Sequence, residues 1–222
     1  HKGIWAYEAL VRGPEGEPAY TILEQVSDAN RYRFDQVIRA RAISLASDLG
    51  MEAMLSINFL PNAVYKAETC IRATIEAAEE TDFPLEQIMF EVTEVEELDD
   101  YDHLVDIIDT YQQLGFMTAI DDFGSGYSGL NMFADFQPDL VKLDMDLVRD
   151  IDSDEPRTAI VRGIVDTCRE LDVGIMAEGV ETEAELSTLL DLGVRRFQGY
   201  YFAKPAFEAL PAVDSSLLSA TG

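Results

Sequence analysis

Acidic and amide side chains recur in this sequence at the points where short apolar runs end. Asp121 and Asp122 are adjacent, they follow the apolar run 116–120, and a glycine-rich loop comes directly after them. Carboxylate and amide oxygens are the ligands that the hard cations Mg²⁺ and Mn²⁺ prefer in proteins. Other polar residues stand at or near the ends of the other runs: Glu8, Arg12, Asn58, Glu91, Glu94, Lys142, Asp144, Glu178, Glu181 and Gln198. The recurrence points to one polar site that is built from many segments.

Adjacent aspartates among further acids predict a two-metal centre. Carboxylates gathered at one place repel each other unless cations neutralise them. If one of the two aspartates bridges two metals and the other binds a single metal, cations about 3.5–4 Å apart would suit phosphodiester hydrolysis, because they stabilise the attacking and leaving oxygens. Lys142 and Arg12 would supply positive charge to a phosphate or to the transition state. Each acid taken alone is more often a helix N-cap or a loop residue, and the two aspartates are also explained as a turn. The recurrence at consecutive strand ends favours the site.

The apolar runs alternate with amphipathic segments, which predicts an α/β fold with a mostly parallel sheet and helical crossovers. The expected strands are 4–11, 54–60, 88–93, 116–121, 140–143, 173–177 and 195–202. The expected helices are 20–49 (one helix or two), 67–78, 102–114, 128–133, 156–171 and 182–192. These elements fit an open doubly wound sheet or, with one more strand, a (β/α)₈ barrel. No repeat or linker divides residues 1–222, so a single domain is expected.

The composition excludes several classes of protein. The 43 acidic residues outnumber the 16 basic residues and give a formal net charge of -27, which argues against binding a polynucleotide. No apolar run is long enough to span a membrane and no signal peptide is visible, so no membrane contact is expected from this segment. Cys70 and Cys168 lack metal-ligand spacing and are interpreted as buried thiols, which predicts a cytoplasmic location. The chain does not begin with Met and is expected to be a fragment of a longer protein.

Short motifs around the polar residues occur in a recognisable order. They are YEALVRG (7–13), SINFLP (56–61), FEVTE (90–94), IDDFGSGYSGL (120–130), VKLD (141–144), AEGVET (177–182) and QGYYFAKP (198–205). Each motif alone is a weak signal, but together they resemble the EAL-domain family of cyclic di-GMP phosphodiesterases over nearly the whole chain. The resemblance implies a modified TIM (β/α)₈ barrel whose first strand runs antiparallel to the others. No counterpart of that first strand is found in this sequence, which would explain why the sequence predicts one strand fewer than a (β/α)₈ barrel needs.

The resemblance further implies hydrolysis of cyclic di-GMP to linear pGpG, in which a water bridging two metals attacks the phosphorus in line. Two Mg²⁺ or Mn²⁺ ions per active site are implied, and Ca²⁺ is expected to inhibit because its looser coordination suits in-line chemistry poorly. The implied metal ligands are Glu8, Asn58, Glu91, Asp121, Asp122 and Glu178. The implied catalytic residues are Lys142, which orients the water, Glu178, which resembles the general base, and Asp122. The implied substrate contacts are Leu10, Arg12, Asp144 and Gln198. Asp144 is expected to pair with Lys142 or with a substrate group, and Gln198 to support either the catalytic water or Lys142.

The glycine-rich loop resembles the regulatory loop of the family, which couples dimerisation to metal occupancy. Its residues are Phe123, Gly124, Ser125, Gly126, Tyr127 and Ser128. Glu94 resembles the residue that tethers this loop, and Glu181 is expected to anchor local structure. The implied partners are cyclic di-GMP, a second copy of the chain, and a sensory or regulatory domain elsewhere in the full-length protein.

Two other functions remain open at this point. One is a catalytically idle receptor, which binds cyclic di-GMP and signals through a protein partner. The other is a two-metal barrel phosphohydrolase that acts on a different phosphodiester. The first would be expected to lack an acid or the lysine of the site, and all of these residues are present here.

Overall fold

A single curled sheet organises the protein. The structure, a computed structural model, describes residues 3–93, 101–126, 133–134, 136–214 and 217. Strands β1 to β7 are hydrogen-bonded in the order of the chain, and every neighbouring pair is parallel. Their bounds are β1 Ala6–Ala9, β2 Met54–Asn58, β3 Ile88–Thr93, β4 Met117–Phe123, β5 Leu140–Leu143, β6 Gly174–Ala177 and β7 Arg196–Phe197. This confirms the predicted parallel α/β architecture.

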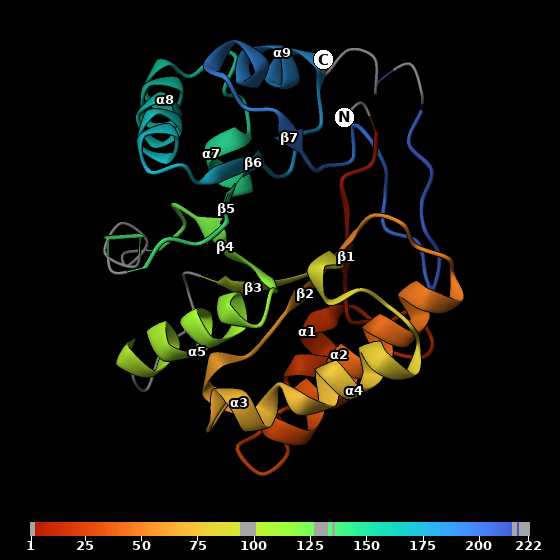
Figure 1. Cartoon of the computed structure of the whole chain (residues 1–222). Coiled ribbons are helices and arrows are strands. Elements are labelled where there is room, and N and C mark those ends of the chain that lie inside the picture. The colour runs from red at the N-terminus through yellow and green to blue at the C-terminus, as the bar shows by residue number, and fades with distance from the viewer. Residues whose placement is uncertain (1–2, 94–100, 127–132, 135, 215–216, 218–222) are drawn as a thin grey trace.

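Helices cover the outer side of the curled sheet (Figure 1). Helices α1 to α5 lie beside the first strands of the sheet, and α7 to α9 lie beside the last strands. Their bounds are α1 Ala19–Leu23, α2 Arg31–Asp48, α3 Ala67–Cys70, α4 Arg72–Glu80, α5 Tyr101–Gln113, α7 Met145–Val148, α8 Glu155–Glu170 and α9 Glu183–Leu192, with short 3₁₀ turns at Pro61–Ala63 and Leu85–Gln87. The sheet is therefore shielded from solvent on its outer face by the helical crossovers that parallel pairing requires.

Most predicted elements are confirmed, and the differences have local causes. The expected helix 67–78 is two helices, α3 and α4, and Ile71 between them is the C-cap of the first and the N-cap of the second. Helix α7 was not expected, since a single turn is too short to show a hydrophobic period. The last strand is only Arg196–Phe197, and the residues that follow it form turns where the sequence predicted an extended strand. The expected helix 128–133 lies almost wholly outside the described residues.

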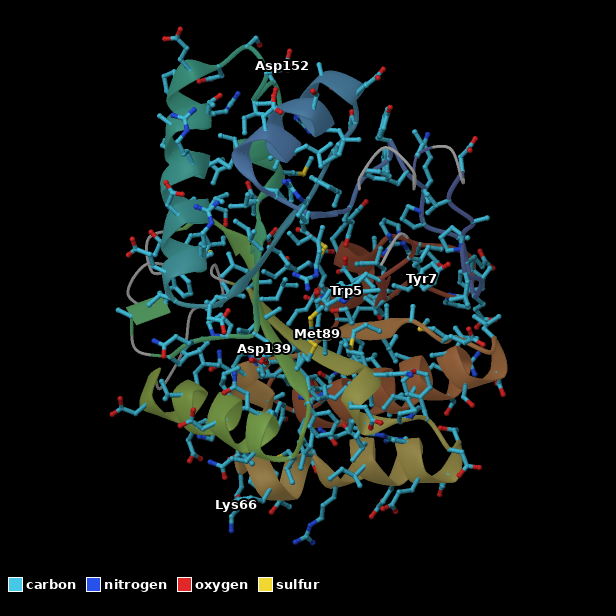
Figure 2. The ribbon with its side chains drawn as sticks, turned by 45° about the horizontal axis from the view of Figure 1, so that its top comes forward. Trp5, Tyr7, Lys66, Met89, Asp139 and Asp152 are labelled. Atoms are coloured by element: carbon cyan, nitrogen blue, oxygen red, sulfur yellow. The ribbon has the colours of Figure 1, made fainter. Side chains whose placement is uncertain are left out.

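The strands that carry the site are deeply buried. Strand β5 is buried at every position, and β3 is buried along all but its last residue. Strands buried on both faces are typical of parallel sheets, and they explain why the sequence shows continuous apolar runs there. At one end of the barrel interior, Met89 and Met176 form an apolar cluster with Trp5 packed against it, and Trp5 and Met89 appear near the middle of Figure 2. Lys66 and Asp152 point outward at opposite ends of that view.

Side chains join the first strand to the last. The Arg196 guanidinium lies over the Trp5 ring, 4.6 Å from its centre, and Gln198 Nε2 donates a hydrogen bond to Glu8 Oε2 at 2.7 Å. Among the described residues, β1 pairs only with β2, so no antiparallel strand lies beside it. None of the described helices combines the length and the apolar character needed to cross a bilayer. Cys70 and Cys168 are buried free thiols, as predicted.

Candidate metal-dependent active site

A fully buried lysine lies at the centre of the polar cluster. Lys142 of β5 is 0% exposed, and its Nζ lies 2.8 Å from Glu91 Oε2 and 2.9 Å from Asp121 Oδ1. The same nitrogen lies 2.7 Å from Glu178 Oε1 and 3.8 Å from Glu8 Oε2. These acids come from β1, β3, β4 and the residue after β6, so the aligned parallel strands bring their carboxylates to one place. The expectation that the strand-end acids converge is therefore met.

The carboxylates form two groups that share one aspartate. Oxygens of Glu8, Glu91 and Asp121 lie within 4.8 Å of one another, and so do oxygens of Asp121, Asp122 and Glu178. This is the donor set that two hard divalent cations with one common ligand would require. Glu91 Oε1 is buried and has no hydrogen-bond partner, which leaves an unused oxygen inside the first group. The residues present thus fit the two cations that the sequence predicts.

Asn58 lies beside the first group but presents its amide nitrogen to it. Asn58 Nδ2 donates a hydrogen bond to Glu8 Oε1 at 2.9 Å. Gln198 occupies the other oxygen of the same carboxylate, so Glu8 accepts a hydrogen bond at each of its oxygens. An amide binds a cation through its oxygen. Binding by Asn58 would therefore require its amide to turn over.

A bulge explains how neighbouring aspartates reach the same site. Successive side chains of a regular strand point to opposite faces, so two adjacent acids would normally diverge. Here the pairing of β4 with β5 shifts register between Ile120 and Phe123, and Asp122 has a φ of 52°. A left-handed backbone is uncommon outside glycine, although aspartate tolerates it better than most residues, and such strain is often found at functional sites. The strand also continues to Phe123, two residues beyond the predicted end at Asp121.

The pKa values indicate an excess of negative charge. Burial raises the pKa of Glu91 to about 8, with Lys142 lowering it and Glu8 and Asp121 raising it. Burial likewise raises the pKa of Glu178 to about 9, against the lowering effect of Lys142. The pKa of Asp122 rises to about 6 through burial and the neighbouring Asp121. One ammonium group therefore does not satisfy the carboxylates around it, and further cations would.

The pKa of Lys142 moves in the opposite sense to that expected for a buried amine. Burial alone lowers the pKa of a lysine because it disfavours the charged form. The carboxylates of Glu91, Glu8, Glu178 and Asp121 outweigh this effect and raise the pKa of Lys142 well above its usual value. Lys142 is therefore a permanent cation, and its ammonium group holds the acids together.

Residues 1–205 match a protein family described as the EAL domain. This chain belongs to the EAL domain family. The match includes every polar residue of the site described above, which confirms the resemblance seen in the sequence.

Curated relatives of this EAL domain differ in the functions their names give. The chain is 31% identical over 211 residues to the blue light- and temperature-regulated antirepressor BluF of Escherichia coli (strain K12), covering 95% of this chain and 52% of that protein. It is 32% identical over 173 residues to cyclic di-GMP phosphodiesterase PdeR of the same organism, covering 78% and 25% respectively. The chain thus spans about half or less of the length of these relatives.

Solved structures confirm the fold of the EAL domain. A standalone versatile EAL protein from Vibrio cholerae O395, in its c-di-GMP bound form, is 52% identical with a TM-score of 0.93, covering 97% of this chain and 90% of that chain. The manganese/cy-diGMP complex of Klebsiella pneumoniae BlrP1 at pH 6 is 34% identical with a TM-score of 0.86, covering 95% and 55%. The curled parallel sheet is therefore the TIM-barrel-like sheet of this family.

Predicted substrate residues of the EAL domain lie around the carboxylates. Leu10 and Arg12 are exposed just after β1, and Arg12 Nη1 donates to its neighbouring Val11 carbonyl at 2.7 Å. Asp144 does not pair with Lys142; its Oδ1 accepts a hydrogen bond from Asp146 N–H at 2.8 Å and caps α7. Gln198 contacts Glu8, and its expected support of the catalytic water stays a prediction.

The beginning of the glycine-rich loop, which is predicted to be regulatory, packs against α7. Phe123 is buried, and Ser125 Oγ donates to the Asp122 carbonyl at 2.7 Å. Gly124 has a φ of 99°, a backbone conformation that favours glycine, and a Cβ placed on it would lie 2.5 Å from Leu147 Cδ1. Gly126 is half-buried. The remaining predicted loop residues, Tyr127 and Ser128, and the tether Glu94 lie outside the described residues.

The local anchor after β6 is Glu185 and not Glu181. Glu181 is exposed, and only its backbone N–H takes part, donating to Glu185 Oε2 at 2.9 Å. Glu185 also accepts from Thr182 N–H at 2.9 Å and from Asp150 N–H at 3.1 Å. Thr182 and Glu185 form a capping box at the start of α9. Their spacing in the sequence would have identified this anchor.

Proposed function

We propose that this chain hydrolyses one phosphodiester bond of cyclic di-GMP to linear pGpG, using two Mg²⁺ or Mn²⁺ ions. The observation that carries the proposal is the pair of carboxylate groups that share Asp121. Its likeness to PdeR, named as a cyclic di-GMP phosphodiesterase, and to a c-di-GMP bound EAL protein supports the reaction and the substrate. The manganese complex of BlrP1 supports the choice of metal.

Each cation is assigned to one group of carboxylates. Glu8, Glu91 and Asp121 would hold the first cation, together with Asn58 after its amide turns, while Asp121, Asp122 and Glu178 would hold the second. The cations would supply a water of lowered pKa and neutralise charge on the phosphate and the leaving oxygen.

The chain's own residues position the water and the substrate. Lys142 stays protonated and would orient the attacking water by donating a hydrogen bond from Nζ. Gln198 holds Glu8 in place through its 2.7 Å hydrogen bond. Arg12 and Leu10, exposed at the edge of the site, would contact the phosphate and guanine of the substrate. Glu178 would receive the proton of the water only while its carboxylate is ionised. Burial raises its pKa to about 9 in the metal-free protein, and a cation bound to the second group of carboxylates would favour the ionised form.

A turnover assay tests this function. The protein is incubated with cyclic di-GMP and Mn²⁺, and pGpG is separated and quantified. Formation of pGpG that ceases on chelation of the metal is the expected result, and Ca²⁺ in place of Mn²⁺ is expected to suppress it. A folded, Mn²⁺-loaded protein that releases no pGpG would contradict the proposal.

A second candidate is an idle receptor that binds cyclic di-GMP and acts through a protein partner. The likeness to the antirepressor BluF favours it. The complete set of acids around Lys142 favours hydrolysis, because a receptor needs no cluster of strained and partly protonated carboxylates. Binding of cyclic di-GMP without pGpG formation would select the receptor.

A homodimer and a further sensory or regulatory domain complete the proposal. The chain spans about half of BluF, which leaves room for such a domain in a longer protein. Sedimentation with and without Mn²⁺ would test the dimer and its expected dependence on metal.

A further inference from the structure

A buried charged pair lies behind the proposed metal ligands of β2 and β3. Asp35 and Arg39 stand four residues apart on α2, and neither side chain is exposed to solvent. Arg39 Nη2 lies 2.6 Å from Asp35 Oδ2, and Arg39 Nη1 donates a hydrogen bond to Tyr111 Oη at 2.9 Å. The pair therefore joins α2 to α5 on the helical side of the sheet.

Aromatic rings connect this pair to the site. The Arg39 guanidinium carbon lies 5.4 Å from the centre of the Phe59 ring and 5.1 Å from that of Phe90. Phe59 directly follows Asn58, and Phe90 directly precedes Glu91. Asn58 and Glu91 are partners in the β2–β3 register, and successive side chains of a strand point to opposite faces. The two ligands thus face the carboxylate cluster while the two rings face Arg39.

Asp35 also holds the backbone that comes after Asn58. Asp35 Oδ1 accepts a hydrogen bond from Leu60 N–H at 3.1 Å. On the other side, Phe59 N–H donates to the Glu91 carbonyl at 3.1 Å. The segment 58–60 is therefore held between β3 and a buried carboxylate of α2, and this carboxylate keeps its place because Arg39 neutralises it.

Stability does not account for burying these charges. Taking two charges out of water is costly, and apolar residues of similar volume at such places are often neutral or stabilising. A buried pair with directed hydrogen bonds does supply defined geometry. We propose that Asp35 and Arg39 are positioning residues of the metal site, which hold Asn58 and Glu91 in place for the first cation. This role rests on the two-metal function proposed above.

The double variant Asp35→Leu/Arg39→Met tests this role by replacing both charges with apolar side chains. Its Mn²⁺ affinity, measured from the electron paramagnetic resonance of free Mn²⁺, is expected to fall about tenfold, the lower end of the loss caused by removing partners behind metal ligands. Turnover is expected to fall at limiting Mn²⁺ and to recover at saturating Mn²⁺. The control variant Val161→Ala creates a cavity in the core that contains residues of α8 and α9, so it lowers the stability of the fold away from the site. It should leave the Mn²⁺ affinity unchanged.

Hydrogen exchange gives a readout that needs no metal. Amides of residues 57–61 are expected to exchange faster in the double variant and at the wild-type rate in Val161→Ala. Should the double variant fail to fold, Tyr111→Phe removes only the 2.9 Å hydrogen bond that Arg39 Nη1 donates to Tyr111 Oη. It keeps both charges and is expected to show the same changes to a smaller extent. Unchanged Mn²⁺ affinity and unchanged exchange would overturn the positioning role. A wild-type chain that binds no Mn²⁺ would overturn the proposed function and with it the role in metal binding, and faster exchange in the variant would then show only that the pair holds segment 58–60 in place.

Discussion

The protein buries two charged clusters, and they differ in the balance of their charges. On α2, one guanidinium meets one carboxylate, and Arg39 and Asp35 are both fully buried. Around Lys142, one ammonium meets several carboxylates, and burial raises the pKa of Glu91 to about 8 and that of Glu178 to about 9. The first cluster is electrically complete. The second has more carboxylates than its lysine can neutralise, so it has the donors and the negative charge to bind further cations, which the first lacks.

The backbone repeats the same contrast. The balanced pair lies on a regular helix at a spacing of four residues, where the two side chains meet without strain. The unbalanced cluster includes a bulge and a left-handed Asp122. Strain of this kind costs free energy and persists only where surrounding structure compels it.

The largest expected effect comes from removing the cation of either cluster. Lys142→Met and Arg39→Met each leave a buried carboxylate without its partner, which should lower the free energy of unfolding of the metal-free protein by about 3–5 kcal/mol. Saturating Mn²⁺ should reduce the loss of unfolding free energy, relative to wild type, only in Lys142→Met, because only at that cluster can a metal ion replace the lost positive charge. Urea denaturation with and without Mn²⁺ measures both effects. Equal rescue of the two variants would show that the clusters do not differ as described.

Removing the shared ligand should be the next largest effect. Asp121→Asn deprives both carboxylate groups of a charge, so turnover of cyclic di-GMP should fall by more than about 100-fold, beyond the loss caused by residues behind the ligands. The exposed Asp166→Asn on α8 is the matched control and should retain full activity. Comparable activity in both variants would place the metals elsewhere.

The two clusters should also respond differently to pH. Because the pKa of Glu91 and of Glu178 is raised in the folded protein, their contribution to stability is complete below their unfolded pKa and is lost as pH rises through about 8 to 9. The metal-free protein should therefore lose about 1–2 kcal/mol per pH unit between pH 7 and 9. Mn²⁺ should reverse this trend, because it binds the deprotonated carboxylates more tightly at higher pH. Urea denaturation at several pH values measures the slope, and a flat metal-free profile would contradict the charge excess.

The smallest effect concerns Glu185, a buried acid that forms no ion pair with a lysine or arginine among the described residues. Backbone N–H groups of Glu181, Asp150 and Thr182 lower the pKa of Glu185 in spite of its burial. Glu185→Gln keeps one acceptor oxygen, so it should cost only about 1 kcal/mol of unfolding free energy, in the range of a helix cap. Mn²⁺ should not alter this cost. A metal-dependent difference, seen in thermal unfolding, would indicate that Glu185 acts on the site.

Sequence reasoning reached the alternation of strands and helices because buried parallel strands appear as apolar runs. It also found the acids of the site, because parallel strands align their carboxyl ends and so bring the residues at those ends together. It could not show that Lys142 is the common partner of these acids, since contacts between strands leave no pattern along the chain. For the same reason it could not show that Asp144 caps α7 and that Gln198 contacts Glu8.

Other features have no signal at the level of single residues. Asp35 and Arg39 resemble any solvent-exposed pair on a helix, and only their packing against α5 shows that they are buried. The left-handed Asp122 cannot be inferred from its residue type. The anchor at Glu185 did have a signal in its spacing from Thr182, which shows that attention to helix caps would have corrected the assignment to Glu181.

The contact between Gln198 and Glu8 has a mechanical consequence. Strands β1 and β7 are the two margins of the sheet, and this hydrogen bond together with Trp5 and Arg196 forms the seam between them. Glu8 belongs at once to the seam and to the first group of carboxylates. A cation bound there would link β1 to β3 and β4. A displacement of β1 at the margin of the sheet would therefore change the metal affinity.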